Sequence, residues 1–255
     1  MTTTRSSSAQ TVGRAVHLLR LIASSKSRDL RLVDIAEMAG LQKSTAHRLL
    51  QRLVDERMLV RDKDARGYQL GPLLYELGLA ALPSTTLRDA AHPAMVRLTQ
   101  ECGDMAFLVA RSGLESVCLD RIAGNFAIQT MTQGIGDRHP LGIGAGGLAI
   151  LSALSDSEIA TVRKAVGPQL RRYRLTQSEL MERVARTRER GCAVDEGTAA
   201  LEVTAIGMAV RDHVGAPAGA IFVASIRSRM ADARLREVER QLRICVRSIE
   251  GRKLR

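Results

Sequence analysis

The pattern of hydrophobic and polar positions predicts two short helices joined by a tight turn near the N-terminus. Apolar residues recur at the spacing of one helix face in two successive segments. They are Leu32, Ile35, Ala36 and Ala39 in the first segment, and Ala46, Leu49, Leu50 and Leu53 in the second. Gly40 lies between them, where a helix-turn-helix needs its turn. An ordinary helical hairpin has the same apolar pattern, so this pattern alone leaves both structures open.

The polar face of the second helix indicates what the pair could do. Its side chains can hydrogen-bond to phosphates or to the edges of bases: Gln42, Lys43, Ser44, His47, Arg48 and Gln51. A helix with such a face fits the major groove of DNA. We therefore predict DNA binding, with a solvated helical hairpin as the alternative.

The flanking segments complete a small winged domain. Residues 10–24 have one apolar helix face, which should pack across the helix pair. Residues 58–70 predict two short strands around a polar turn, a hairpin that we call the wing. Arg61, Lys63 and Arg66 on the wing are expected to contact the phosphate backbone.

The segment 72–82 predicts an apolar linker helix. Pro72 is favourable in the first turn of a helix, and apolar side chains follow on nearly every face. A helix of this kind must be covered, either by its own domains or by the same helix of a second subunit. We favour the contact between subunits.

The rest of the chain predicts a second domain of the α+β class. Capping boxes at Ser155 and Thr176 mark the starts of two helices. Helices are expected over 87–102, 145–154, 155 onward, 176–190 and 231–252, and strands over 105–110, 116–122, 126–131, 203–211 and 219–226. We expect an antiparallel sheet with its helices collected on one side.

The charge is concentrated in the predicted winged domain. The chain has a net charge of +11 and a pI near 10.3. Residues 1–71 hold 13 Lys or Arg against 7 Asp or Glu. A basic domain favours a polyanionic partner, although solubility alone would also account for the charge. Aromatic residues make up only 2% of the chain, which argues against single-stranded nucleic acid held by stacking.

The termini and the cysteines indicate a cytoplasmic protein. The polar N-terminus lacks the apolar core of a signal peptide, and no apolar run approaches the ~18 residues of a membrane span. The four cysteines have no metal-ligand spacing and should be small core residues in a reducing compartment: Cys102, Cys118, Cys192 and Cys245.

A glycine-rich segment, 134–147, contains the spacing G-x-G-x-x-G from Gly142 to Gly147. A dinucleotide site would need a preceding buried strand and an acid near position 162, which is Val162. We therefore expect no nucleotide cofactor. The glycines could instead leave the start of the following helix open to a small anion such as a carboxylate. A close-packed turn without a ligand is the alternative.

The sequence contains no catalytic or metal-binding constellation. The five histidines lie at no metal-ligand spacing, and no serine lies in G-x-S-x-G. Asp195 and Glu196 are adjacent, and adjacent residues of a strand point to opposite faces. We expect a protein that is not an enzyme and has no metal.

The order of these features resembles the IclR family of bacterial transcriptional regulators. The resemblance runs from about residue 9 to 252 and is carried by TVGRAVHLLRLI, DIAEMAGLQKSTAHRLLQRL, GYQLG, HPLGIGAGGLAIL, RGCAVDEG and VRDHVGAPAGAI. It implies a disordered tail (1–8), a winged helix-turn-helix domain (9–71), a linker helix (72–86) and a GAF-like effector-binding domain (87–255). It also implies a homodimer or a dimer of dimers, in which a small organic acid tunes binding to a double-stranded operator.

The resemblance also implies functional residues. Lys43, Ser44 and Thr45 match the start of the family's recognition helix, with Gln42 where proline is common, and Arg48 matches its usual arginine. The implied effector pocket is lined by Met131, Gly144, Ala145, Gly146, Asp195, Ala205, Phe222 and Ala224. Since three of these are apolar where some members have polar groups, we expect an aromatic or larger acid.

We therefore predict an effector-responsive, sequence-specific regulator of transcription. The main DNA contacts are expected from Gln42, Lys43, Ser44, Thr45, His47 and Arg48, with Arg61, Lys63 and Arg66 on the wing. The alternatives are an enzyme with an appended winged helix and an architectural DNA-binding protein without sequence preference.

Overall fold

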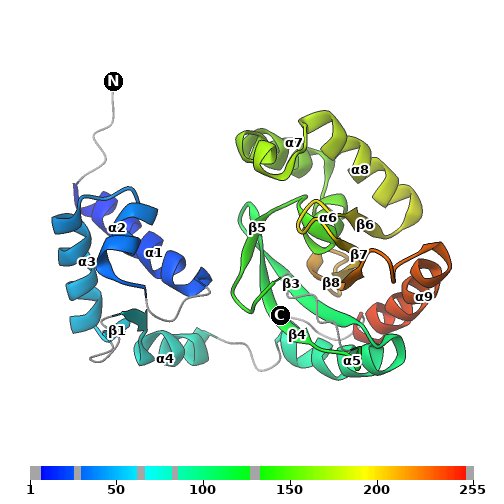
Figure 1. The fold of residues 1–255 in the computed structure, drawn as a ribbon, viewed down its shortest axis with the longest axis horizontal. Helices are drawn as coiled ribbons and strands as arrows, with labels where there is room; N and C mark the ends of the chain where they lie inside the picture. The colour runs from blue at the N-terminus through cyan, green and yellow to red at the C-terminus, as the bar shows by residue number, and fades with distance from the viewer. Residues whose placement is uncertain (1–6, 26–29, 62–66, 82–85, 127–132, 251–255) are drawn as a thin grey trace. The chain divides into compact units, whose positions relative to one another are not determined.

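The computed structural model describes residues 7–25, 30–61, 67–81, 86–126 and 133–250. The chain divides into two compact units, residues 1–82 and 83–255 (Figure 1). Of the sequence-based predictions, those for Lys63, Arg66 and Met131 lie outside the described residues. The first helix begins at Ser7, so the last two residues of the predicted disordered tail are helical.

The first unit has the predicted winged helix-turn-helix. Its elements are α1 (Ser7–Ser24), α2 (Leu32–Met38), α3 (Lys43–Asp55), the antiparallel strands β1 (Leu59–Arg61) and β2 (Tyr68–Leu70), and α4 (Pro72–Ala81). The apolar faces of these elements meet in one core around Leu18, Ile35 and Leu50. Gly40 forms the turn between α2 and α3 with a φ of +61°, a conformation that glycine adopts without strain.

Helix α4 carries its apolar side chains on its surface. None of its residues is buried, and Tyr75, Leu77 and Leu79 are all exposed. Arg57 ties the helix to the rest of the first unit through an ion pair of 2.9 Å to Glu76. The apolar surface predicted for the linker helix is therefore present and is left uncovered by the described residues of its own unit.

The second unit is built on a six-stranded antiparallel sheet in the order β5-β4-β3-β8-β7-β6. The strands are β3 (Met105–Ser112), β4 (Glu115–Ile122), β5 (Arg138–Pro140), β6 (Ala193–Glu196), β7 (Val203–Arg211) and β8 (Pro217–Ile226). At its centre the rings of Phe107 and Phe222 stack with centroids 4.7 Å apart. The two short edge strands, β5 and β6, were not predicted. Phe126, where the sequence predicted a further strand, is not in one, and 127–131 lie outside the described residues.

Helices cover both faces of this sheet, so the prediction that they collect on one side was wrong. One face packs on α5 (Leu87–Cys102) and α9 (Asp232–Ile249). The other packs on α6 (Gly144–Ser152), with α7 (Asp156–Val166), a 3-10 helix (Gly167–Tyr173) and α8 (Gln177–Arg190) completing that core. The reason lies in the central strands, where neighbours such as Phe107 and Leu108 are both apolar and point to opposite faces.

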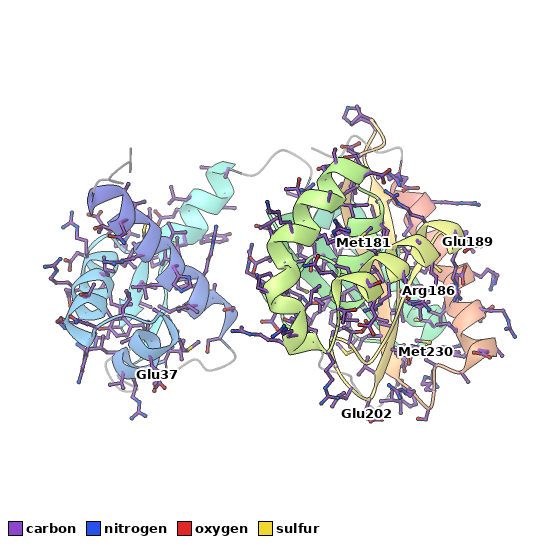
Figure 2. The ribbon with its side chains drawn as sticks, turned by 90° about the horizontal axis from the view of Figure 1, so that it is seen from above. Glu37, Met181, Arg186, Glu189, Glu202 and Met230 are labelled. Atoms are coloured by element: carbon purple, nitrogen blue, oxygen red, sulfur yellow. The ribbon has the colours of Figure 1, made fainter. Side chains whose placement is uncertain are left out.

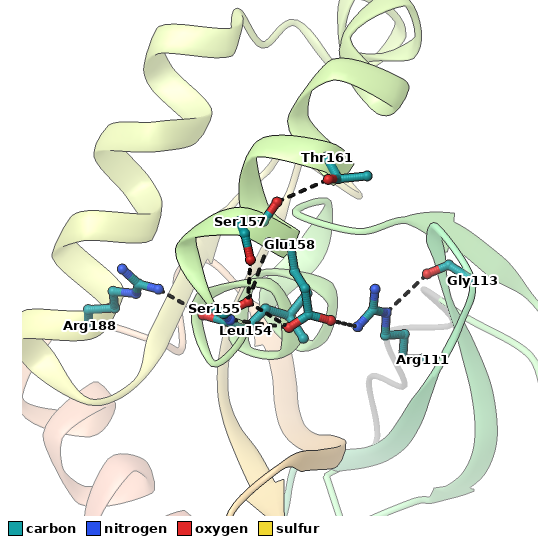
Figure 3. A network of polar contacts seen from close by, with 8 residues as sticks. All are labelled: Arg111, Gly113, Leu154, Ser155, Ser157, Glu158, Thr161 and Arg188. Atoms are coloured by element: carbon teal, nitrogen blue, oxygen red, sulfur yellow. Dashed lines mark hydrogen bonds and ion pairs between the residues drawn. The ribbon is translucent and has the colours of Figure 1, made fainter.

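The predicted capping boxes at Ser155 and Thr176 are confirmed, and the first belongs to a polar network (Figure 3). Glu158 accepts a hydrogen bond of 2.7 Å from Arg111 of β3, which together with the bonds from Ser155 lowers the pKa of the Glu158 carboxyl. Arg188 of α8 donates to the carbonyl oxygen of Leu154 at 2.8 Å. The network thus ties the start of α7 to both the sheet and α8. None of the described helices is long and apolar enough to cross a membrane.

Helix α6 packs against the sheet at positions where any side chain in place of glycine would collide with its neighbours. A Cβ on Gly146 would lie 2.7 Å from Cγ2 of Val109 and 2.8 Å from Cδ1 of Phe222. A Cβ on Gly207 of β7 would lie 2.8 Å from the carbonyl oxygen of Ala145. The helix start can therefore rest on the strands only while both positions lack a side chain.

The close contact at Gly146 predicts the cost of a single methyl group. Gly146→Ala should lower the free energy of unfolding by about 1–3 kcal/mol, because the methyl forces Val109 and the stacked Phe222 to move. Gly147→Ala is the matched control, since the nearest atoms to its Cβ would be Ser116 Oγ at 3.3 Å and two backbone atoms at 3.5 Å. Urea denaturation followed by circular dichroism measures both, and equal stabilities for the two variants would contradict the prediction.

The cysteines of the second unit predict slow thiol chemistry. All four are free and buried, and burial raises the pKa of Cys118 and Cys245 to about 12 and that of Cys192 to about 11. Because the thiolate is the reacting species, we expect an aromatic disulfide reagent at about pH 8 to label the folded protein slowly. All four thiols should react at once in denaturant. Rapid labelling of any thiol in the folded protein would contradict this.

Candidate recognition helix and effector pocket

Helix α3 presents a polar surface opposite its buried face. Ala46, Leu50 and Leu53 are buried in the core of the first unit. Around them, the side chains predicted to contact DNA are exposed or, for Thr45, half-buried: Gln42, Lys43, Ser44, Thr45, His47 and Arg48. The helix has no acidic residue in its first turn, so the positive end of its dipole is uncompensated by its own side chains.

The two halves of α3 differ in how their polar side chains are engaged. In the second half Gln51 donates to Asp55 at 3.0 Å, and Arg52 pairs with Glu56 at 2.6 Å. In the first half, no hydrogen bond or ion pair with another described residue engages the side chains of Lys43, His47 or Arg48. The donors that a DNA ligand needs are therefore unengaged where a recognition helix enters the groove.

The wing carries one described basic residue. Arg61 is exposed at the end of β1, with its guanidinium carbon 5.9 Å from the centroid of the Tyr68 ring. Tyr68 is itself buried in the core of the first unit. The guanidinium of Arg61 is thus within cation–π distance of a buried aromatic ring, which favours a position of the arginine side chain beside the two strands.

In the second unit, a small pocket lies between the start of α6 and the sheet. Its cavity volume is about 30 Å³, which is room for about two water molecules. The described residues of the predicted effector site all line it: Gly144, Ala145, Gly146, Asp195, Ala205, Phe222 and Ala224. The sheet register accounts for this grouping, because Asp195 pairs with Ala205, and Ala205 pairs with Ala224, in a row across three strands.

The pocket has a polar end that the sequence did not indicate. Ser116, Gln133 and His139 also line it. Ser116 and His139 are cross-strand partners on β4 and β5, and Gln133 donates to the carbonyl oxygen of Asp137 at 3.3 Å. The three-residue strand β5 is too short to give a periodic pattern, so the sequence gave no indication that His139 would face the same space as Gly144.

A loop between β6 and β7, residues 197–202, covers the other end of the pocket. Ala199 and Ala200 line the pocket, and the Cβ of Ala199 is 3.5 Å from where a side chain on Gly144 would begin. Gly144 has a φ of +67°, a conformation that glycine adopts without strain.

The carboxylate of Asp195 is fully engaged within the protein. The residue is only 2% exposed. Its Oδ1 accepts a hydrogen bond of 2.5 Å from Arg183 of α8, and its Oδ2 accepts one of 3.3 Å from the backbone N–H of Ala199. Arg183 also donates to Thr198 Oγ1 at 2.9 Å. The one acidic group among the described residues of the pocket therefore faces it as half of an ion pair.

Within the described ranges, no group of three or more His, Cys, Asp or Glu side chains could hold a metal ion. Buried carboxylates of the described residues accept hydrogen bonds from neighbouring side chains instead. Asp104, for example, accepts from Ser225 at 2.7 Å and from Arg229 at 2.8 Å. Asp120 accepts from Nδ1 of His92 at 2.7 Å.

Known proteins share this arrangement along nearly the whole chain. The family model for the IclR helix-turn-helix domain matches residues 11–63, and that for the bacterial transcriptional regulator IclR C-terminal domain matches residues 79–251. The transcriptional regulator XynR of Escherichia coli K12 is 28% identical over 237 residues, which cover 91% of this chain and 92% of that protein. The transcriptional repressor IclR of the same strain is 26% identical over 232 residues, which cover 89% of this chain and 84% of that protein.

Solved structures show the same fold. An IclR regulator from Alicyclobacillus acidocaldarius superposes with a TM-score of 0.76 at 22% identity, over 94% of this chain and 97% of that chain. An IclR homologue from Microbacterium hydrocarbonoxydans, solved in complex with 4-hydroxybenzoate, gives a TM-score of 0.73 at 24% identity, over the same shares of the two chains. The curated relatives are named as regulators and repressors, so this protein is a regulator rather than an enzyme. Since the C-terminal match alone spans more than half of the chain, the protein belongs to the IclR family of bacterial transcriptional regulators.

Proposed function

We propose that a small organic acid, held in the pocket beside α6, changes the affinity of helix α3 for a double-stranded DNA operator. The observation that carries the proposal is the first half of α3, where Lys43, His47 and Arg48 are exposed and make no bond with the rest of the described chain. Binding to chromosomal operators would take place in the cytoplasm. The identity of the operator follows from selection on random duplex DNA.

The DNA contacts divide into two kinds. Gln42, Lys43, Ser44, Thr45, His47 and Arg48 are proposed to contact the major groove. Arg61, with Lys63 and Arg66, is proposed to contact phosphates, which position the protein without reading sequence. The ion pair of Arg52 with Glu56 at 2.6 Å favours a lesser role for that second arginine of α3.

The exposed apolar side of α4 supports a homodimer, itself able to pair further. Tyr75 and Leu79 lie about one turn apart on the same face of α4, and both would leave water if two copies of α4 packed together, which the hydrophobic effect favours. A two-fold dimer would present two copies of α3 to a palindromic operator.

The pocket favours an acid with an apolar body. Phe222, Ala205 and Ala224 form an apolar wall, while the first turn of α6 has no side-chain cap. Uncapped N–H groups at a helix start attract a carboxylate. Because a volume of about 30 Å³ is too small for an aromatic acid, binding must enlarge the pocket. The 4-hydroxybenzoate held by the Microbacterium homologue makes aromatic acids the first class to test.

A ligand screen tests the whole proposal. Organic acids are scored by thermal shift, and each compound that stabilises the protein is added to a mobility-shift assay with the selected operator. We expect at least one acid to raise the melting temperature, to be recovered unchanged, and to alter operator affinity. Equal binding to scrambled DNA, or acids that stabilise the protein without altering DNA affinity, would contradict the proposal.

Arg48→Ala tests the recognition helix. If Arg48 contacts a base, its loss should weaken operator binding by about 1–3 kcal/mol and relax the preference at one position. Arg52→Ala is the matched control on the same helix, expected to change binding by less than about 0.5 kcal/mol. Titration at fixed salt gives both values, and an unchanged affinity for Arg48→Ala would remove this residue from the interface.

Charges on one face of α4 test the dimer. The double change Tyr75→Glu and Leu79→Glu places two charges on the same helix face, at the proposed contact, and should shift the protein to monomers in analytical ultracentrifugation. Val214→Glu, at an exposed apolar position of the second unit, should leave the assembly unchanged. Monomeric wild-type protein, or a dimer that survives both glutamates, would contradict the proposed contact.

A further inference from the structure

A shared wall separates the effector pocket from a larger groove in the second unit. The groove has a volume of about 590 Å³ and lies between α8, β6 and the start of α9. Arg183 and Thr198 line the groove, whereas Asp195 and Ala199 line the pocket. These four residues are joined by the hydrogen bonds described above, so the wall is a single polar network.

The charge within this wall bears directly on an acidic ligand. Unpaired, the carboxylate of Asp195 would repel a second carboxylate in the same small pocket, where little water screens the two charges. The guanidinium of Arg183 lies 2.5 Å from it, and the two side chains are only 11% and 3% exposed. Burial distinguishes this pair from a solvent-screened surface ion pair, so its charge balance acts at close range on whatever occupies the pocket.

The same arginine also fixes the loop over the start of α6. Its Nη1 donates a hydrogen bond to Oγ1 of Thr198. Asp195, which Arg183 orients, accepts a hydrogen bond from the backbone N–H of Ala199. A second arginine, Arg227, holds the far end of the loop by donating to the carbonyl oxygen of Leu201 at 3.0 Å. The position of the 197–202 loop therefore depends on Arg183 at the end nearer to Asp195.

From this geometry we infer that Arg183 is a positioning residue of the effector site, which makes the pocket selective for acids by cancelling the charge of Asp195. It acts through Asp195 and the 197–202 loop rather than by touching the ligand. The inference rests on the proposed function, since it concerns the same pocket.

The test compares an acid with its neutral isostere. The probes are 4-hydroxybenzoate and 4-hydroxybenzamide, and calorimetry on the full-length protein gives the ratio of their affinities. In Arg183→Met the affinity for the acid relative to the amide should fall by on the order of tenfold, because the negative charge of Asp195 is left uncompensated. In Asp195→Asn it should rise by a similar factor, because Arg183 is left uncompensated. The double variant should return close to the wild-type ratio.

Arg186→Met is the matched control. Arg186, which Figure 2 labels, lies three residues further along α8. It is exposed and makes no bond with another described residue. Its loss removes the same charge from the same helix and should leave the ratio unchanged. A loss of fold alone would lower both affinities together, whereas the inference requires the ratio to move in opposite directions in Arg183→Met and Asp195→Asn.

The outcomes separate the inference from the proposed function. If wild type binds the acid and the ratio stays constant in Asp195→Asn, the inference is overturned while the proposed effector class stands. The near-isosteric Asn keeps this result available even if Arg183→Met does not fold. A ratio that shifts equally in Arg186→Met also overturns it. If wild type binds neither probe, the aromatic-acid proposal fails and the inference fails with it.

Discussion

The close contact between helix α6 and the sheet is the constraint on which the second unit depends. Gly146 brings the helix against Val109 and Phe222, and Gly207 admits the backbone of Ala145 from the other side. The helix start consequently lies among side chains of the strands rather than in solvent. This contact places the first turn of α6 beside the row that begins with Asp195, and it leaves only a small pocket between them. The pocket is thus a product of packing, and a larger ligand requires a movement of the helix, of the 197–202 loop or of the side chains that line it.

The parts of the fold that follow from local pattern could be predicted from the sequence. The helical spacing around Leu50, the turn at Gly40 and the capping boxes at Ser155 and Thr176 each involve residues within about a turn of one another, and all appear as predicted. The edge strands β5 and β6 could not be predicted, because three and four residues are too few to give a period. The two-sided covering of the sheet was missed for another reason. Apolar neighbours such as Phe107 and Leu108 indicate burial on both faces, but the run is only a few residues long in each strand and is also compatible with one open face.

The candidate site divides in the same way. The resemblance to the family predicted that Gly144, Asp195 and Ala205 line one pocket, and the strand register explains why Asp195 and Ala205 are neighbours there. The polar and charged groups around the pocket could not be predicted from the sequence. Arg183 joins Asp195 from a different element, and His139 reaches the pocket from the opposite edge of the sheet. Such contacts depend on how a helix is rotated over the sheet, and no spacing along the chain encodes that rotation.

The connection of α4 to the first unit determines what a dimer could transmit to DNA. The N–H of Gly71 bonds to the carbonyl oxygen of Met58 at 2.8 Å, and that of Leu73 to the carbonyl oxygen of Arg57 at 3.2 Å. Any side chain on Gly71 would overlap the backbone of Arg57, so the chain leaves β2 in one conformation only. Together with the ion pair of Arg57 and Glu76, these bonds make α4 a rigid extension of the domain that carries α3. If two copies of α4 pair, a small change in the angle at which they cross would change the distance between the two recognition helices. Because a palindromic operator accepts only one spacing of its half-sites, that change would alter affinity without any change in the contacts that α3 makes.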